Sequence, residues 1–483
     1  MRFHPAAGFM GDPIPFYHNG EFHLFYLRRV LPEAPVPGCP WGHAVSRDLV
    51  HWETLPDVVS PGAEGEPDCG DCWTGSVIER SGTFHAFYTG HAPHHPTRPQ
   101  SVCRATSTDL IHWQKDPANP ILLPPPDRYE HTDWRDPFVF FHAEEGCYWM
   151  VITCRLKMPG DAPRRGCLTV ATSPDLERWE VQAPIWSPSS LHAPECPDLW
   201  QEDGRWRLLF SNGTTQSRVA PTPFGPWRRT SETDADGRWF YAAKCFHAPD
   251  SRRAPSESYL GRRHLLVGWV ASREGSTDAG TREWGGTISL PREAFLLPDG
   301  GLGWRAPAEI ADAWNTSAGE LQLRPVVGSW TFGEASVGES GDGFALALAE
   351  GVPDSYRLET WITPGVDQDA EGFRQVTAGL LLRYGSGGDG GYVVALEPGL
   401  QRVAVRQWQR WGDPEPMATQ YVALSPGEPV HLDLYLDGSV LEVFVADRAV
   451  ISARCYDHTS GHVGLWVQDG RARFAGTRLL TPS

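Results

Sequence analysis

Three carboxylates stand out in this sequence because they occupy nearly the same place in three repeated units. Asp12, Asp136 and Glu195 lie eight, ten and nine residues before a glycine that opens a short aromatic segment. Equivalent positions of repeated units gather on one side of the structure that the repeats build. We therefore expect these distant acids to meet at one site, where they could serve as nucleophile and as general acid.

The local sequence around each acid favours such roles. Asp12 follows a glycine and precedes a proline, which gives a stiff turn that is open to close approach. Arg135 adjoins Asp136, and a fixed guanidinium favours the ionised form of a neighbouring carboxylate. Glu195 is framed by Pro194 and a Cys-Pro pair, an apolar setting that suits a general acid at neutral pH.

The repeated unit is about sixty residues long. Gly20, Gly82, Gly146, Gly204 and Gly261 each lead a short aromatic and apolar segment, at intervals of 62, 64, 58 and 57 residues. A second signature, Ser followed by Asp-Leu and then Trp, keeps a similar period. It occurs at Ser46 to Trp52, Ser107 to Trp113 and Ser173 to Trp179.

This period and the short strands predict an all-β chain. Five units of about sixty residues, each with several strands separated by Gly, Pro and Asp turns, are typical of a five-bladed β-propeller over residues 1–300. The alternative is a β-sandwich in which the similar intervals between the glycines arise by chance. Residues 301–325 contain three prolines and are expected to be a linker, and the alternating pattern of 326–483 predicts a β-sandwich domain.

Composition excludes several classes of partner. The chain has 42 Lys and Arg against 60 Asp and Glu, and its net charge of −18 would repel nucleic acid and anionic membranes. A neutral substrate is compatible with this charge, and the 21 tryptophans could stack on sugars or fill the core. The ten cysteines are scattered, and we expect no metal site, no cofactor and a cytoplasmic protein, or a secreted one if a signal was trimmed. A homo-oligomer is compatible with the sequence.

Several motifs around the three acids form a recognisable set, and they run from the first repeat to the last domain. They are Trp41-Gly42-His43, Trp73-Thr74-Gly75-Ser76, Trp134-Arg135-Asp136-Pro137, Glu195-Cys196, Phe240-Tyr241-Ala242-Ala243-Lys244, Trp284-Gly285 through Leu290-Pro291-Arg292-Glu293, and Leu441-Glu442-Val443-Phe444.

Over nearly its whole length the chain resembles glycoside hydrolase family 32, the invertase, levanase and inulinase group. This resemblance implies a five-bladed propeller followed by a β-sandwich, and retaining cleavage of terminal β-D-fructofuranosyl residues from sucrose, fructooligosaccharides or fructans. It implies Asp12 as the nucleophile, Glu195 as the acid/base and Asp136 as the stabiliser of the transition state. The motifs supply candidates for substrate binding: Arg135, Trp41, Trp73, Ser76, Trp134, Lys244 and Trp284.

The chain departs from the family pattern beside the expected nucleophile. Gly11 stands where the family usually has Asn, Ile14-Pro15 replaces Asn-Gly, and Leu27 replaces a Gln. Polar groups that would hydrogen-bond the sugar are therefore missing, and such groups discriminate strongly between substrates. Hydrolysis of another furanoside such as an arabinofuranoside, fructosyl transfer, and carbohydrate binding without catalysis are the alternatives.

Overall fold

Nearly all of the regular structure is β-strand, as the short runs of aromatic and β-branched residues predict. The structure is a computed structural model that describes residues 2–5, 8–29, 38–158, 164–230, 234–249, 262–341, 343–366, 375–385, 390–408 and 415–483. The chain divides into two compact units. The first is Met1–Thr233, Tyr241–Trp269 and Trp284–Ser289, and the second is Asp234–Phe240, Val270–Glu283 and Leu290–Ser483.

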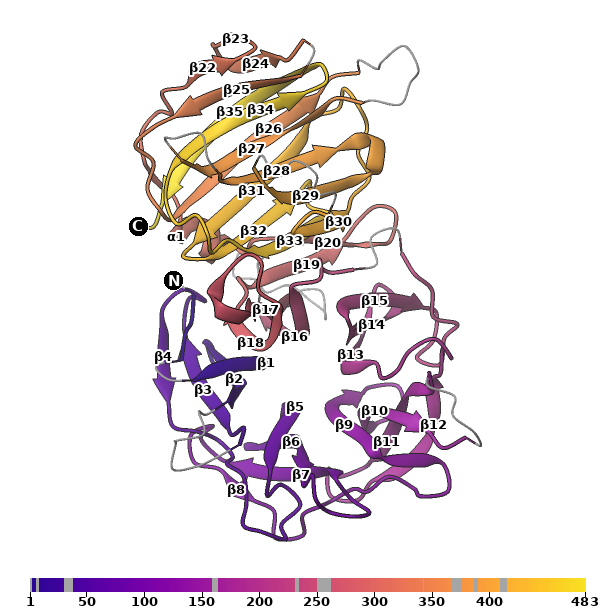
Figure 1. Ribbon diagram of the computed structural model, residues 1–483. Helices are drawn as coiled ribbons and strands as arrows, with labels where there is room; N and C mark the ends of the chain where they lie inside the picture. The colour runs from indigo at the N-terminus through magenta and orange to yellow at the C-terminus, as the bar shows by residue number, and fades with distance from the viewer. Residues whose placement is uncertain are drawn as a thin grey trace. The chain divides into compact units, whose positions relative to one another are not determined.

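Four antiparallel groups of strands succeed one another along the first unit. The first, β1 to β4, is part of a nine-stranded sheet, and it is followed by two four-stranded sheets and one three-stranded sheet. In Figure 1 the first strands of these groups face a common centre. The strands are β1 (Phe9–His18), β2 (Glu21–Arg29), β3 (Trp41–Ser46) and β4 (Trp52–Leu55); β5 (Asp71–Arg80), β6 (Thr83–His91), β7 (Gln100–Ser107) and β8 (Gln114–Lys115); β9 (Tyr129–His142), β10 (Cys147–Leu156), β11 (Gly166–Ser173) and β12 (Glu180–Trp186); and β13 (Glu195–Glu202), β14 (Arg205–Asn212) and β15 (Thr214–Ala220).

Three later strands follow, namely β16 (Phe240–Pro249), β17 (Arg262–Arg273) and β18 (Arg282–Ile288). In the first unit, β18 pairs with β1, with Met10 opposite Gly286. The aromatic segments of the predicted repeat lie in β2, β6, β10, β14 and β17, so the prediction of strands at these places is confirmed. Gly261 lies outside the described residues.

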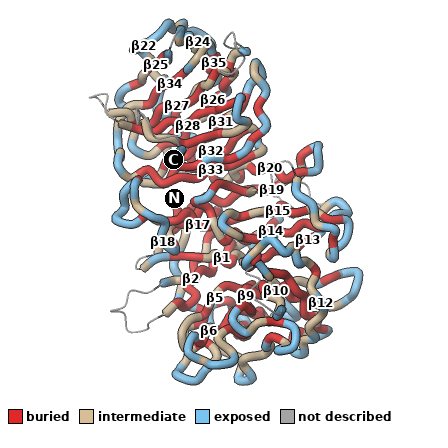
Figure 2. The backbone as a smooth tube through the Cα atoms, turned by 45° about the vertical axis from the view of Figure 1, so that its right-hand side comes forward, coloured by how far each residue is buried: buried red, intermediate tan, exposed pale blue. Residues whose placement is uncertain are grey.

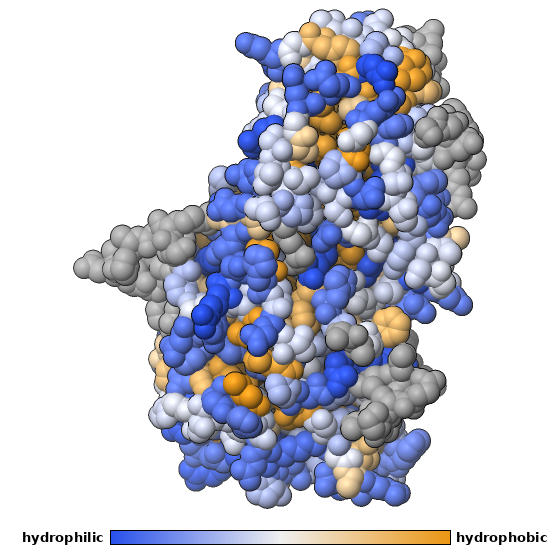
Figure 3. Space-filling model, turned by 90° about the vertical axis from the view of Figure 1, so that its left-hand side faces the viewer, coloured by the Kyte–Doolittle hydropathy of each residue, from blue (hydrophilic) through white to orange (hydrophobic). Residues whose placement is uncertain are grey.

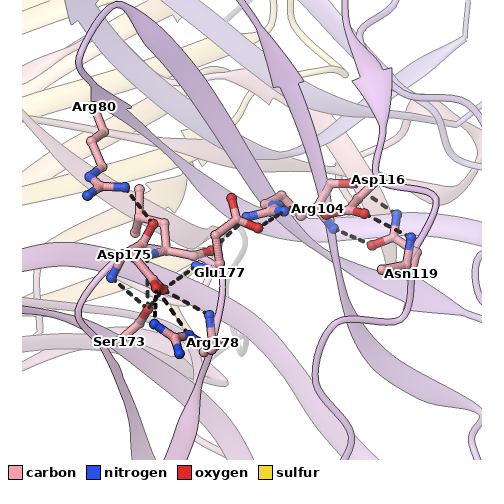
Figure 4. A network of polar contacts seen from close by, with 10 residues as sticks. Arg80, Arg104, Asp116, Asn119, Ser173, Asp175, Glu177 and Arg178 are labelled. Atoms are coloured by element: carbon pink, nitrogen blue, oxygen red, sulfur yellow. Dashed lines mark hydrogen bonds and ion pairs between the residues drawn. The ribbon is translucent and has the colours of Figure 1, made fainter.

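The Ser-Asp-Leu-Trp signature forms the same turn three times. In the third copy the Ser173 hydroxyl contacts Asp175, and Leu176 takes a left-handed conformation with φ of 67°. The leucines of the other two copies have φ of 64°, which shows that the turn geometry repeats with the sequence. Arg104 binds Glu177 beside this turn with a 2.6 Å ion pair and also contacts Asp116, which ties the second sheet to the third (Figure 4).

The second unit contains two large antiparallel sheets, one of eight and one of seven strands (Figure 1). The predicted strands near 378–384, 391–396, 430–436 and 441–445 are all present, and the Gly-rich loop between the first two lies mostly outside the described residues. The elements are β19 (Arg292–Leu296), β20 (Leu302–Arg305), α1 (Ala308–Ala313), β21 (Thr316–Ser317), β22 (Arg324–Val327), β23 (Ser329–Thr331), β24 (Ala335–Glu339), β25 (Phe344–Ala349), β26 (Tyr356–Pro364), β27 (Thr377–Tyr384), β28 (Tyr392–Glu397), β29 (Arg402–Gln407), β30 (Ala418–Tyr421), β31 (Val430–Asp437), β32 (Val440–Val445), β33 (Ala449–Arg454), β34 (His462–Gln468) and β35 (Arg471–Thr481).

The segment expected to be a linker, 301–325, carries β20, α1 and β21 and belongs to the second unit. Short 3-10 turns lie at Glu274–Ser276 and Pro398–Leu400. In the part of the chain that the structure describes, we found no helix that combines the length and apolar character of a membrane span.

Burial follows the strands in both units, and the loops carry most of the exposed residues (Figure 2). The face shown in Figure 3 is largely hydrophilic with separate apolar patches, as is usual for a folded protein surface. Two histidines make a polar contact inside the first unit. The Nδ1 of His23 lies 3.0 Å from the Nε2 of His43, and both rings are packed inside the first sheet.

This histidine pair should make the first unit sensitive to acid. Burial lowers the pKa of His23 to about 4 and the pKa of His43 to about 3, so both rings are neutral in the folded protein at neutral pH. An unfolded histidine takes up a proton near pH 6.5, and the unfolded state therefore binds more protons between about pH 6.5 and pH 4. We expect the free energy of unfolding to fall as the pH is lowered through this window because of the pair.

Denaturant unfolding at pH 7 and pH 5 would test this. His43→Gln should show a smaller difference between the two pH values than wild type. His112→Gln, which changes an exposed histidine, should behave like wild type. Equal pH dependence in all three proteins would show that the buried pair is not the source.

Candidate active site

The three acids sit where the first strand of a sheet carries one extra residue. The register of β1 against β2 shifts between Met10 and Pro13, where Asp12 lies. The same one-residue excess occurs on β9 around Asp136 and on β13 just after Glu195. A bulge of this kind interrupts the alternation of a strand and re-aims a side chain.

The backbone at these bulges is strained where the sequence has no glycine. Asp136 has φ of 59° and Cys196 has φ of 49°, both in the left-handed region. Such conformations cost of order 1–3 kcal/mol each and persist where the surrounding structure holds them. The fourth bulge, on β5, has the same form between Trp73 and Gly75 and places Thr74.

Asp12 is held by donors from three other strands. The Thr74 hydroxyl donates to Asp12 Oδ2 at 2.5 Å, and the Trp269 indole N–H donates to Oδ1 at 2.9 Å. The Cys196 thiol lies 3.6 Å from Oδ2. Burial raises the pKa of Asp12, the Glu195 charge raises it further, and the bonds from Thr74 and Trp269 oppose this shift. The donors thus stabilise an ionised carboxylate that burial would otherwise disfavour.

Asp136 is buried and shares a partner with Asp12. Its Oδ2 accepts the backbone N–H of Cys196 at 2.8 Å, and its own backbone N–H donates to the Thr89 hydroxyl at 2.8 Å. Burial raises the pKa of Asp136 to about 7, with the Glu195 charge adding to the rise and Arg135 opposing it. Cys196 therefore contacts both aspartates and is covalently joined to Glu195, which brings the three acids together.

Glu195 is the most open of the three acids, with 33% of its side chain exposed. The Arg135 Nη2 lies 3.0 Å from its Oε1, and the Tyr241 hydroxyl donates to its Oε2. Burial raises the pKa of Tyr241, and the adjacent Glu195 charge raises it further, so the phenol keeps its proton and acts as a donor. Glu195 can therefore reach solvent while two fixed groups hold its orientation.

Four of the residues predicted to bind substrate lie in the interior of the protein. Trp41 and Trp134 are both 0% exposed, and the Trp41 indole N–H donates to the Trp73 carbonyl at 3.0 Å. Ser76 is buried and bonds Pro137 and Val139, and Lys244 is buried against Asp198 and Pro197. Trp41 and Trp134 have no exposed surface with which to touch a sugar, so we correct the prediction of direct contact for these two. Ser76 and Lys244 are about as buried as Asp136, and their contact with a substrate stays a prediction.

Three predicted binding residues remain accessible to a ligand or to the acids. Arg135 contacts Glu195 directly. Trp73 is partly exposed, and its ring stacks on His91 at a centroid distance of 3.8 Å. Trp284 is 38% exposed and lies 6.3 Å from the Trp269 ring.

Sequence reasoning missed four groups that touch the acids: Thr74, Trp269, Tyr241 and the Cys196 thiol. Thr74, Tyr241 and Cys196 lie inside motifs that were recognised, so their position was signalled although their contacts were not. Trp269 closes the fifth aromatic segment of the repeat, and its indole nitrogen could have been a candidate donor for that reason.

Gly11 is required by the ring beside it. A Cβ placed on Gly11 would lie 2.4 Å from Cζ2 of Trp284, a distance that atoms do not tolerate. We expect Gly11→Ala to displace the Trp284 ring and to lower kcat/KM of a reaction catalysed by these acids roughly tenfold, with little change in folding. Steady-state kinetics would measure this.

Two further variants separate the causes. Gly333→Ala adds a methyl group to open space and should leave kinetics unchanged. Gly11→Ala combined with Trp284→Ala relieves the overlap, and its kcat/KM should match that of Trp284→Ala alone. A Gly11→Ala enzyme as active as wild type would show that the position of Trp284 is not important.

Among the described residues, no three His, Cys, Asp or Glu side chains are grouped so as to hold a metal ion. All ten cysteines are free thiols, including Cys69 and Cys72 of the single C-x-x-C. The groups that contact Asp12 and Glu195 are a guanidinium, a phenol, an indole, a hydroxyl and a thiol.

Comparisons with known proteins show the family to which the chain belongs. The model for the glycosyl hydrolases family 32 N-terminal domain matches residues 2–301, and the model for the family 32 C-terminal domain matches residues 402–479. The chain is 26% identical over 477 residues to sucrose-6-phosphate hydrolase from Escherichia coli, covering 94% of this chain and 88% of that protein. Raffinose invertase from Escherichia coli is also 26% identical, over 97% of this chain and 91% of that protein.

Solved structures share the fold. Fructan 1-exohydrolase IIa from Cichorium intybus superposes with a TM-score of 0.73 at 20% identity, covering 100% of this chain and 97% of that chain. The β-fructofuranosidase BmSUC1 from Bombyx mori gives a TM-score of 0.69 at 21% identity, covering 100% and 93%. Because the family model spans more than half of the sequence and the N-terminal match contains all three acids, the chain belongs to glycosyl hydrolase family 32.

Proposed function

We propose that this chain is a retaining glycosidase that removes terminal β-D-fructofuranosyl residues from sucrose, fructooligosaccharides or fructans. The observation that carries the proposal is the pair of contacts made by Cys196, the residue after Glu195. Its backbone N–H donates to Asp136 and its thiol contacts Asp12, so the three acids lie close together. The sequence relatives named sucrose-6-phosphate hydrolase and raffinose invertase support the substrate class. The substrate would be a carbohydrate, and the residues of the site need no cofactor.

In the first step Asp12 would attack the anomeric carbon while Glu195 gives a proton to the leaving oxygen. Asp12 suits attack because Thr74 and Trp269 hold its carboxylate in one orientation and stabilise its charge. Glu195 suits proton transfer because it is the acid open to solvent and to a leaving group. The product of this step is a covalent glycosyl-enzyme with the configuration inverted once.

In the second step Glu195, now ionised, would take a proton from water as the water attacks the anomeric carbon. The bond to Asp12 breaks, the configuration is inverted a second time, and net retention results. Asp136 would accept hydrogen bonds from ring hydroxyls that strengthen as positive charge develops on the sugar. Arg135 would keep Glu195 oriented between the two steps.

The family match also supports the finer architecture. We propose that residues 1–300 form a five-bladed β-propeller whose innermost strands carry the acids and that 326–483 form a β-sandwich. Residues 301–325, expected to be a linker, would then be a connection that carries β20, α1 and β21 and packs as part of the second unit. The four first strands with matching bulges, β1, β5, β9 and β13, support four of the blades.

Hydrolysis of a different furanoside is the second candidate. Ile14 and Leu27 are buried in one apolar cluster with Trp41, and Gly11 carries no side chain at all. The strand of Asp12 thus offers the sugar few polar side chains, which favours weaker discrimination among furanose hydroxyl groups. Fructosyl transfer would use the same first step with a sugar in place of water.

A substrate panel tests the proposal. We expect cleavage among sucrose, sucrose-6-phosphate, inulin, levan and raffinose, and the NMR signal of the first-formed sugar should show the β-anomer. Arylarabinofuranosides in the same panel test the second candidate. Release of α-fructose first would disprove retention, and turnover of no furanoside would disprove the proposal as a whole.

A further inference from the structure

A chain of alternating charges runs away from the candidate acid/base and ends at the edge of the third sheet. Arg135 binds Glu195 with one nitrogen and Asp133 with the other, at 3.0 and 2.7 Å. Arg155 from β10 lies 3.3 Å from the second oxygen of Asp133 and 3.5 Å from Glu130. Arg165 pairs with the other oxygen of Glu130.

All members of this chain are largely shielded from water. The side chains of Arg135, Asp133 and Arg155 are only 11%, 11% and 13% exposed. Ion pairs in such surroundings are screened by solvent much less than surface pairs. A change in the charge of one side chain therefore alters the electrostatic potential at its neighbour. The proposed mechanism uses Arg135 but assigns no task to Asp133.

Asp133 fixes the direction of the Arg135 guanidinium. Its Oδ1 accepts from Nη1, and the Gln100 amide oxygen accepts from the same nitrogen at 3.2 Å while also accepting the Trp134 backbone N–H. With Nη1 held on this side, Nη2 is left to point at Glu195. The planar guanidinium has fixed donor directions, so anchoring one edge sets the other.

Asp133 is one of three carboxylates that interact with the positive charge of Arg135. Burial opposes the charged guanidinium, but Asp136, Glu195 and Asp133 together raise the pKa of Arg135, so it stays protonated. The charged or titratable groups that surround it come from five strands: Asp12 on β1, Asp133 and Asp136 on β9, Cys154 and Arg155 on β10, Glu195 and Cys196 on β13, and Tyr241 on β16.

We propose that Asp133 is a positioning residue that tunes the proton affinity of the acid/base pair through Arg135. Its negative charge offsets part of the Arg135 charge that acts on Glu195 and Asp136. Arg155 and Glu130 hold Asp133 in turn. This inference rests on the proposed function for its role in catalysis, but its electrostatic part does not.

Asp133→Asn tests the inference with almost no change in shape. The amide oxygen can still accept from Arg135, but the charge that offsets Arg135 is gone. We expect the alkaline limb of the kcat/KM profile to move down by about one pH unit, while the maximal kcat changes by less than about threefold. A purely structural role would lower stability without moving the limb.

Asp116→Asn is the matched control, because Asp116 forms a comparably buried ion pair with Arg104 elsewhere in the same unit. Its pH profile should overlap that of wild type. An unshifted profile for Asp133→Asn, or an equal shift in Asp116→Asn, would overturn the inference while leaving the proposed hydrolysis intact.

A second measurement does not depend on turnover. The pKa of Asp136 lies at about 7 in the folded protein, so the folded state holds a proton that the unfolded state has lost between about pH 4 and pH 7. Stability from this group therefore falls as pH rises through that window. Without the Asp133 charge, Arg135 should lower the pKa of Asp136, so the Tm at pH 7 minus the Tm at pH 5 should be more positive in Asp133→Asn than in wild type. The histidine pair contributes equally to both proteins. An unchanged difference in Tm would count against the inference even if no furanoside were cleaved.

Discussion

Asp12→Asn should abolish hydrolysis, with a fall in kcat of about 10⁴-fold or more for every furanoside that the wild-type protein cleaves. The amide has nearly the same shape as the carboxylate: its oxygen can accept from the Trp269 indole N–H, and its NH2 group can donate to the Thr74 hydroxyl. It cannot, however, form a glycosyl ester with the anomeric carbon. The loss should therefore appear in kcat with a nearly unchanged affinity for substrate, measured by steady-state kinetics and by calorimetric titration.

Two comparisons make this prediction specific. Asp48→Asn removes a carboxylate from one of the repeated turns. It should leave kcat within about twofold of wild type, since in the described part of the chain Asp48 bonds Ser46, Val50 and His51 of its own turn. Asp12→Gly leaves room for azide, which should restore turnover and give a glycosyl azide of inverted configuration. Hydrolysis at the wild-type rate by Asp12→Asn would remove Asp12 from the reaction.

Glu195→Gln should cause a loss that depends on the leaving group. A sugar leaving group needs a proton, and we expect kcat/KM to fall about 10²- to 10⁴-fold for sucrose-type substrates. A nitrophenyl furanoside has a leaving group that needs little help, so formation of the glycosyl-enzyme should be almost as fast as in wild type. Release of nitrophenol should then show a burst, because the second step lacks its base.

Tyr241→Phe provides the intermediate case. It removes the donor to Glu195 Oε2 but keeps the carboxyl group, so its effect should be much smaller and should vary with pH. The same loss for sugar and nitrophenyl leaving groups in Glu195→Gln would show that Glu195 acts through substrate binding or folding and not as an acid.

The fold was largely predictable because strands carry a local signal. The aromatic segments beginning near Phe22 and Phe84 are strands for the physical reason that the pattern indicates, since alternate bulky side chains pack well on a pleated surface. The repeated Ser-Asp-Leu-Trp turn was visible as a signature, but its left-handed leucine was not, because a bulky residue at positive φ is disfavoured by local sterics and depends on its context.

The site was predictable in its acids and not in its surroundings. Asp12, Asp136 and Glu195 shared a phase that could be counted along the chain. The spacing of residues does not show that Trp284 is exposed and Trp134 is buried. Both are tryptophans in a motif, and only the packing around them distinguishes the two. The contact of Trp269 with Asp12 spans 257 positions, and no local pattern encodes such a pairing.

One added residue in each of four opening strands has a consequence for how this protein can change. A strand that alternates regularly presents its side chains in a fixed order, and a single insertion turns one of them out of that order without disturbing the partners on either side. The side chains of the site therefore do not have to follow the alternation of inward and outward side chains that stabilises the sheets. Thr74 already occupies such a place with a hydroxyl, so exchanging the residue there would alter what the protein does to a bound molecule while the framework stays as it is.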